Sequence, residues 1–392
     1  MNQTLHTKMA NLLGVVELFL RLGVTAFGGP AAHITLMEQE VVVRRGWLSR
    51  AEFLDLLGTA NLIPGSNPIK IAILTGYRRA GWLGFLLGGI CFLLPAVLIV
   101  SVIAWAYVYY GKWPPTDALF YGIKPIVIAV MVQAMWYLGR TTVKTPLLAM
   151  VGAGGVVAGF FDVNLLLILL VSGLLMLTAR VIGRMVKGTA AGVAPLPQAA
   201  PGFKLLSMAG TLAPFSIGTM FLFFLKVGCV TFGSAYVLVA FLHTDLVQHR
   251  QWLTESQLLD AVAIGQFTPG PLLATATFVG YVLGGPQAAA VATVAIFLPA
   301  FVFCCAVIGP LAPRLRRSRL IAGFLAGVNV ASLALMIVVT WRLGSVALVD
   351  WLTISLGVAA AVWLLFYRVN STWLILGGAA VGLARFVFEN GF

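Results

Sequence analysis

The polar residues that could do chemistry in this apolar chain occur as pairs, with one member in each half. The cations Arg21 and Lys226 occupy matching positions inside apolar segments. A charge held at membrane depth is costly and usually serves a function, so we interpret both as anion-attracting groups. A pair between Arg21 and Glu17, one turn earlier, is the alternative. The acids Glu40 and Asp245 also match, and we expect them to form structural ion pairs with basic neighbours.

Glycine and proline interrupt the chain at matching places in the two halves. A helix that restarts after such a break presents unpaired backbone N–H groups at its positive end, an arrangement that binds anions. Four such ends at one interface predict an oxyanion site, whereas packing kinks are the alternative. The predicted substrate-binding residues are the two cations and the residues at and beside the breaks: Arg21, Gly28, Gly29, Asn61, Pro64, Gly65, Ser66, Asn67, Lys70, Lys226, Gly233, Ser234, Gln266, Thr268 and Gly270.

Side chains near the breaks refine this prediction. Asn61 and Gln266 lie three residues before the proline of each Pro-Gly break, and their amides can donate to an oxyanion or contact a helix. Lys70 follows the first break closely, so we expect it to face a polar cavity, holding the anion or pairing with Asp55. His33 has no counterpart in the second half and is assigned to packing.

Each Pro-Gly break lies within a segment that is typical of a re-entrant hairpin. Ser49-Arg50-Ala51-Glu52 and Thr254-Glu255-Ser256-Gln257 are capping boxes, so helices are expected to begin near Arg50 and Glu255. Each arm beside a break has only about 12 to 15 residues, too few to cross ~30 Å of hydrocarbon at ~1.5 Å per residue. Asp55 and Asp260 lie on the first arms, where they either carry protons for coupling or lock the hairpin.

The composition is that of a polytopic membrane protein built from helices. Hydrophobic residues make up 60% of the 392 residues and charged residues 9%. The net charge of +13 resides mostly in short loops, which orients membrane proteins and gives no reason to expect a nucleic-acid partner. The four cysteines and four histidines show no ligand spacing, so neither a metal nor a cofactor is expected.

The chain divides into two repeats, each with a broken front region followed by four plain spans. The spans are expected at 83–110, 118–138, 145–161 and 163–179, and at 285–311, 319–341, 346–367 and 371–388. The first repeat is placed at 1–180, a cytoplasmic linker at 181–204 and the second repeat at 205–392. Arg78-Arg79 is matched by Val282-Leu283, while the next loop carries its arginines in the second half only. This opposite alternation predicts repeats of inverted topology, as in many secondary transporters.

The motif string resembles the chromate transporter (CHR) family across both halves. The motifs that carry the resemblance are Phe27-Gly28-Gly29-Pro30, Arg45-Gly46-Trp47-Leu48, Asn61-Leu62-Ile63-Pro64-Gly65, Gly76-Tyr77-Arg78-Arg79, Thr231-Phe232-Gly233, Trp252-Leu253 and Thr268-Pro269-Gly270-Pro271. The resemblance implies a bacterial inner-membrane exporter of chromate, a tetrahedral dianion, that confers chromate resistance. Lys70 departs from the pattern, because the family's first hairpin typically carries a Glu there.

Other functions remain open from the sequence. Sulfate or another oxyanion is the alternative substrate, because backbone N–H donors select charge and shape and not the central atom. A membrane-embedded enzyme acting on lipid-linked phosphate is an alternative of another class, disfavoured because no catalytic constellation is apparent. An assembly subunit without its own pathway is disfavoured by the paired breaks. The lipid bilayer is the expected surrounding, and a homodimer is an open alternative.

Overall fold

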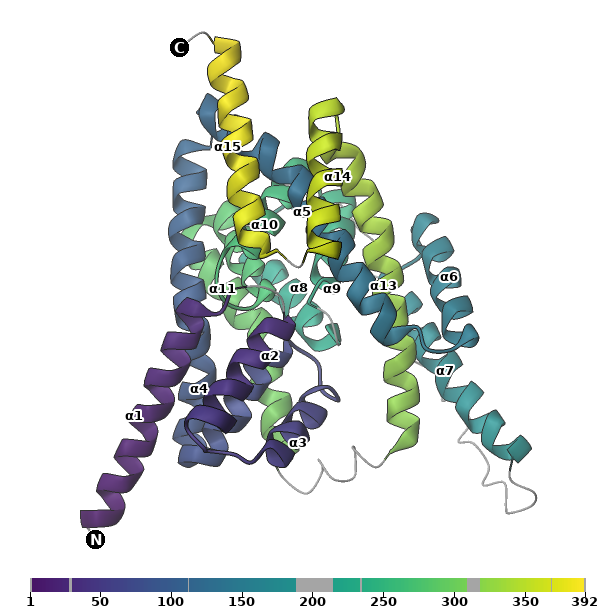
Figure 1. Cartoon of the computed structure of the whole chain (residues 1–392). Coiled ribbons are helices and arrows are strands. Elements are labelled where there is room, and N and C mark those ends of the chain that lie inside the picture. Colours follow the sequence, from purple (N-terminus) through teal and green to yellow (C-terminus); the bar gives the residue numbers. More distant parts are fainter. Residues whose placement is uncertain are drawn as a thin grey trace.

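The computed structural model describes residues 2–27, 30–111, 113–187, 214–232, 235–308, 318–367 and 369–390, and these residues form helices without a strand. Within these ranges, six helices are long and apolar enough to cross a membrane. The expected class, an all-α polytopic membrane protein, is confirmed. Figure 1 shows the first helix and the last helix extending from opposite ends of the molecule.

The first half consists of a broken front region and four further helices. Its elements are α1 (Asn2–Thr25), α2 (Pro30–Glu38), the π-helix η1 (Gln39–Arg44), α3 (Arg50–Ala60), α4 (Asn67–Tyr110), α5 (Pro114–Thr142), α6 (Pro146–Phe160) and α7 (Leu165–Lys187). Helix α7 thus covers 181–187, which we had expected to belong to the linker, and residues 188–213 lie outside the described ranges.

The second half repeats this order of elements. It contains α8 (Ile217–Val230), α9 (Val237–Phe241), the π-helix η2 (Leu242–His249), α10 (Glu255–Phe267), the 3-10 turn η3 (Leu272–Ala274), α11 (Thr275–Ile308), α13 (Arg319–Ala347), α14 (Trp351–Phe366) and α15 (Ser371–Asn390). The two π-helices occupy matching positions, and no motif in the sequence indicates them. Such π-helical turns often lie at functional sites.

Helices α4 and α11 each contain a sharp turn at matching glycines. Gly81 has a φ of 65° and Gly285 a φ of 73°, a backbone conformation that favours glycine. In α4 the turn folds 67–79 back against the following span, so closely that a methyl group on Gly76 would overlap the carbonyl of Gly84. The turns separate a short hairpin arm from a long span, as expected from the sequence.

The later helices of each half pack against those of the other half. Helix α5 of the first half packs against α14 and α15 of the second, while α13 of the second half packs against α6 and α7 of the first. Figure 1 shows α6 and α7 beside α13 at one flank of the molecule. Helices α4 and α11 contact each other. The core is therefore shared, and both broken regions face the interface between the halves.

Candidate functional site

Both hairpins begin with the capping boxes that the sequence indicates. Ser49 accepts a hydrogen bond from the backbone of Glu52, whose carboxylate accepts one from the Ser49 backbone. Thr254 and Gln257 make the same reciprocal pair in the second half. These contacts satisfy backbone donors at the helix starts. Helices α3 and α10 then end before the Pro-Gly breaks, which confirms the predicted helix–break–helix arrangement.

The breaks of the two halves are joined by reciprocal backbone hydrogen bonds. The N–H of Gly65 donates to the carbonyl oxygen of Thr231 at 2.7 Å, and the N–H of Gly270 donates to that of Ala26 at 3.1 Å. Ala26 and Thr231 are themselves equivalent positions, and each directly precedes a Phe-Gly break. Each hairpin tip is therefore fixed to the other half of the chain.

The glycines at the tips are also closely packed. Gly65 has a φ of +100°, and a Cβ added there would lie 3.0 Å from the Cβ of Ala300. Gly270 has a φ of +98°, and its added Cβ would lie 2.6 Å from the Cβ of Ala96. We expected these N–H groups to bind the anion. That expectation needs correction for Gly65 and Gly270, because both N–H groups are already bonded across the interface.

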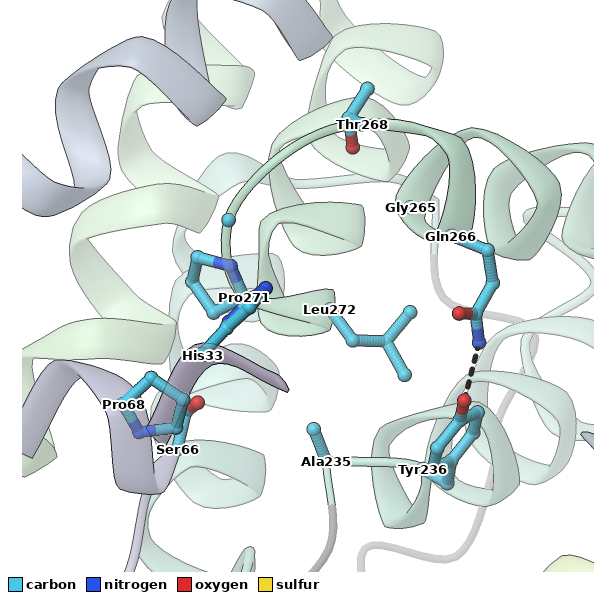
Figure 2. A pocket seen from close by; sticks show the side chains of 11 residues that line it. His33, Ser66, Pro68, Ala235, Tyr236, Gly265, Gln266, Thr268, Pro271 and Leu272 are labelled. Carbon is cyan, nitrogen blue, oxygen red and sulfur yellow. Dashed lines mark hydrogen bonds between the residues drawn. The ribbon is translucent and has the colours of Figure 1, made fainter. Parts of the chain in front are cut away.

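A small pocket lies where the two sets of breaks meet. It is lined by His33, Ser66, Pro68, Ala235, Tyr236, Gly265, Gln266, Thr268, Gly270, Pro271 and Leu272. In the view of Figure 2, His33 and Ser66 lie on one side, Gln266 and Tyr236 lie on the other, and Leu272 lies between them. Of the predicted binding residues, the structure places Ser66, Gln266, Thr268 and Gly270 at this pocket. Among the described residues that line it, none is acidic.

The pocket is too small for an oxyanion in this conformation. Its volume is about 20 Å³, which is enough for roughly one water molecule. This volume is smaller than that of a tetrahedral oxyanion, which carries four oxygens around a central atom.

The matched cations form ion pairs and do not line the pocket. Arg21 pairs with Glu40, and Lys226 donates to Asp245 at 2.5 Å. The same two equivalent positions are thus joined in both halves, linking α1 to η1 and α8 to η2. Glu40 also pairs with its basic neighbour Arg44 at 2.6 Å, as expected for a structural ion pair. These contacts give Arg21 and Lys226 a structural role, contrary to our interpretation of them as anion-attracting groups.

Lys70 is buried in the first hairpin and bonded to main-chain carbonyls. Its side chain is fully buried, and Nζ donates to the carbonyl oxygens of Ala60 at 2.6 Å and Ile63 at 2.7 Å. The residue therefore caps the end of α3, whose last carbonyls lack helical partners. We expected Lys70 to face the cavity or pair with Asp55. Its hydrogen bonds go instead to the backbone, and it is not among the residues that line the pocket.

The matched aspartates differ in their surroundings. Asp55 is exposed on α3, whereas Asp260 is 4% exposed on α10. Asp260 accepts a hydrogen bond from the Tyr107 hydroxyl at 2.9 Å and lies 3.3 Å from Nζ of Lys124. Both partners belong to the first half, so Asp260 locks the second hairpin to it. This observation favours the locking role for Asp260, while proton transfer remains a prediction.

The polar pairs beside the breaks hold the tips in shape. Asn67 donates its amide to the side-chain oxygen of Asn61 at 2.7 Å, which bridges the first break. Gln266 donates its amide to the hydroxyl of Tyr236 at 2.8 Å, within the pocket wall (Figure 2). Because the amide nitrogen of Gln266 makes this contact, its side-chain carbonyl oxygen lies toward the pocket. Asn61 and Asn67 are not at the pocket.

Sequence reasoning missed two functional candidates. His33 was assigned to packing, yet it lines the pocket, and Tyr236 had not been singled out. Both lie within a few residues after a Phe-Gly break, so the rule that polar groups beside a break face the site would have found them. The predicted residues Gly28, Gly29, Gly233 and Ser234 lie outside the described ranges.

The fold and the pocket define a class of protein. Paired broken helices that meet at a polar pocket inside an α-helical membrane protein are typical of secondary transporters. Residues 13–177 and 218–383 match the family of chromate transporters, so the chain belongs to that family. The two matched segments correspond to the two halves of the fold.

Named relatives cover nearly the whole chain. A chromate transport protein of Pseudomonas aeruginosa is 34% identical over 95% of this chain and 91% of its own. A chromate transport protein of Cupriavidus metallidurans is 30% identical over 95% of this chain and 92% of its own. A probable chromate transport protein of Synechococcus elongatus is 30% identical over 97% of both chains. No solved structure matches this chain.

Proposed function

We propose that this chain exports chromate from the cytoplasm across the inner membrane of a bacterium and thereby confers chromate resistance. The observation that carries the proposal is the pocket between the two halves, lined by the hairpin tips and free of acidic residues within the described lining. Such a lining accepts a dianion without charge repulsion, while hydroxyl and amide groups supply donors. The relatives named as chromate transport proteins support chromate as the substrate.

The membrane potential favours this direction of transport. Moving one elementary charge through 100 mV changes its free energy by ~2.3 kcal/mol, so a negative interior drives a dianion outward by about twice that amount. Export therefore does not depend on proton coupling for its energy. The relatives are named as transport proteins, which supports transport over enzymatic action on lipid-linked phosphate.

The asymmetry of the two hairpins supports an alternating mechanism. Helix α10 is buried along most of its length and bonded to the first half through Asp260, whereas α3 buries only part of its surface. In repeats of opposite topology, opening one hairpin while the other stays locked exposes the pocket to one side at a time. We propose that the halves, 1–180 and 205–392, are inverted in this sense and joined by the cytoplasmic linker 181–204, whose first residues, 181–187, continue helix α7.

Reconstitution into proteoliposomes tests the function. With an imposed potential, positive inside the vesicle, we expect uptake of radioactive chromate that rises with the potential. Excess sulfate reports whether the site distinguishes the two oxyanions. G270L is the inactive control, because the added side chain meets Ala96, and G58L is its matched control, because nothing lies within 4 Å of Gly58. Absence of chromate flux at every potential contradicts the proposal. Sulfate flux faster than chromate flux would identify sulfate as the preferred substrate.

A second test concerns resistance in cells. Expression in a chromate-sensitive bacterium is expected to raise the tolerated chromate concentration several-fold and to lower intracellular chromate. The G270L variant, present in the membrane at the same level, is expected to do neither. Raised intracellular chromate on expression would reverse the proposed direction of transport.

A further inference from the structure

His33 is a buried imidazole that has no hydrogen-bond partner. The residue is 2% exposed, and neither ring nitrogen makes a hydrogen bond. The backbone of Ala26 lies nearby without a bond of acceptable geometry, and the ring meets Phe92 edge-on at a centroid distance of 6.2 Å. A buried polar group left unsatisfied costs about 1–3 kcal/mol. Buried polar groups normally have a hydrogen-bond partner, which for His33 can be a water molecule or a ligand.

The ring lies at the wall of the central pocket. Figure 2 shows His33 beside Pro271 and Ser66, across the pocket from Gln266 and Tyr236. His33 belongs to α2, which begins at Pro30, so it lies near the positive end of that helix. An anion in the pocket would therefore meet an imidazole N–H, the hydroxyl of Ser66 and the polar groups of the second hairpin.

The charged groups near α2 are already paired. On α2 itself, Glu38 lies 3.3 Å from Nε of Arg50. On η1, which packs against α2, Glu40 pairs with Arg21 and with Arg44. These carboxylates therefore have cationic partners other than the imidazole.

The titratable groups on the other neighbours have partners as well. On α4, which also packs against α2, the ammonium of Lys70 donates to two backbone carbonyls. Next to α9, the hydroxyl of Tyr236 accepts from Gln266. Among the described residues that line the pocket, His33 alone can gain a positive charge by titration.

Resting on the proposed function, we propose that His33 binds the transported oxyanion directly and makes its binding depend on pH. The neutral imidazole donates one N–H to an anion oxygen, and the protonated ring adds a full positive charge beside the dianion. Protonation therefore strengthens anion binding, and by linkage anion binding draws a proton onto His33. Affinity is expected to rise as the pH falls and to decline as the imidazolium loses its proton.

Anion binding to the purified protein tests the role of His33. Sulfate is the main probe because it stays a dianion between pH 6 and 8, whereas chromate itself gains a proton in the weakly acidic range. We expect sulfate affinity of the unmodified protein to be at least tenfold higher at pH 6 than at pH 8. H33Q is expected to reduce this ratio to about twofold or less, and H33N serves as a second variant if H33Q is unstable.

A matched control and an independent readout complete the test. H249Q changes an exposed histidine on η2 that is not among the residues lining the pocket, and it is expected to keep the full pH dependence. Adding sulfate to weakly buffered protein is expected to remove up to one proton per chain from solution, and H33Q is expected to abolish this uptake. An unchanged pH profile in H33Q, with proton uptake intact, overturns the role of His33. Absence of binding of either anion to the unmodified protein instead overturns the proposed function.

Discussion

Gly65 of the first hairpin donates its backbone N–H to the carbonyl oxygen of Thr231 in the other half, at 2.7 Å. Gly270 repeats this bond with Ala26, so each hairpin tip is tied to the residue that precedes the opposite Phe-Gly break. One net backbone hydrogen bond contributes only about 0.5–1.5 kcal/mol. Contacts of this size can break and re-form during transport, and they place the tips at the wall of the pocket.

We predict that G65A and G270A each reduce transport at least tenfold. An L-residue with a positive φ costs roughly 1–2 kcal/mol, and overpacking against Ala300 or Ala96 adds about 1–3 kcal/mol. Chromate flux and thermal stability in detergent measure the effect. G81A separates the cost of backbone strain from the cost of overpacking. Gly81 also has a positive φ, but no atom lies within 4 Å of a Cβ added there. Equal losses in G81A and G65A would show that backbone strain alone is responsible.

We predict that K70M destabilises the protein by about 1–3 kcal/mol, because it removes the buried ammonium that donates to the carbonyls of Ala60 and Ile63. Oxyanion affinity of the folded fraction is expected to change less than about twofold. Thermal unfolding and sulfate binding measure the two quantities. K144M, at an exposed lysine, is the control and is expected to stay within about 0.5 kcal/mol. A tenfold loss of affinity with normal stability would show that Lys70 takes part in anion binding.

We predict that D260N costs more stability than the double variant D260N/K124Q. Removing one partner of a buried pair leaves an uncompensated charge, at a typical cost of 3–5 kcal/mol, whereas removing both leaves none. A double-mutant cycle on thermal unfolding measures the coupling. D55N is the matched comparison, because Asp55 is exposed at the equivalent position, and a loss below about 1 kcal/mol is expected. Additive losses would show that Asp260 and Lys124 do not stabilise each other.

We predict that the turns at Gly81 and Gly285 face opposite sides of the membrane. R78C and Q287C, each in a background without the four native cysteines, place thiols at exposed positions beside these turns. A membrane-impermeant maleimide is expected to label R78C from the cytoplasmic side, as its adjacent arginines suggest, and Q287C from outside. Labelling of both variants from one side would contradict the inverted arrangement.

The sequence by itself determined the membrane class, the helix–break–helix hairpins and the family. Hydrophobic spans, capping boxes and Pro-Gly breaks are local signals, because each depends on residues a few positions apart. The duplicated motifs also located the interface between the halves, since two matching breaks in an apolar chain need a shared surface on which to bury irregular backbone.

Only the tertiary structure decided which polar groups reach the pocket. Arg21 and Lys226 look like anion ligands in the sequence, yet each meets the acid at the equivalent position of its own half. His33 looks like a packing residue, yet the fold leaves its nitrogens unpaired at the pocket wall. The partner of a charged or polar side chain at membrane depth is selected by close contacts between distant segments, because burial makes unpaired groups costly. Residue types and spacing do not encode those contacts.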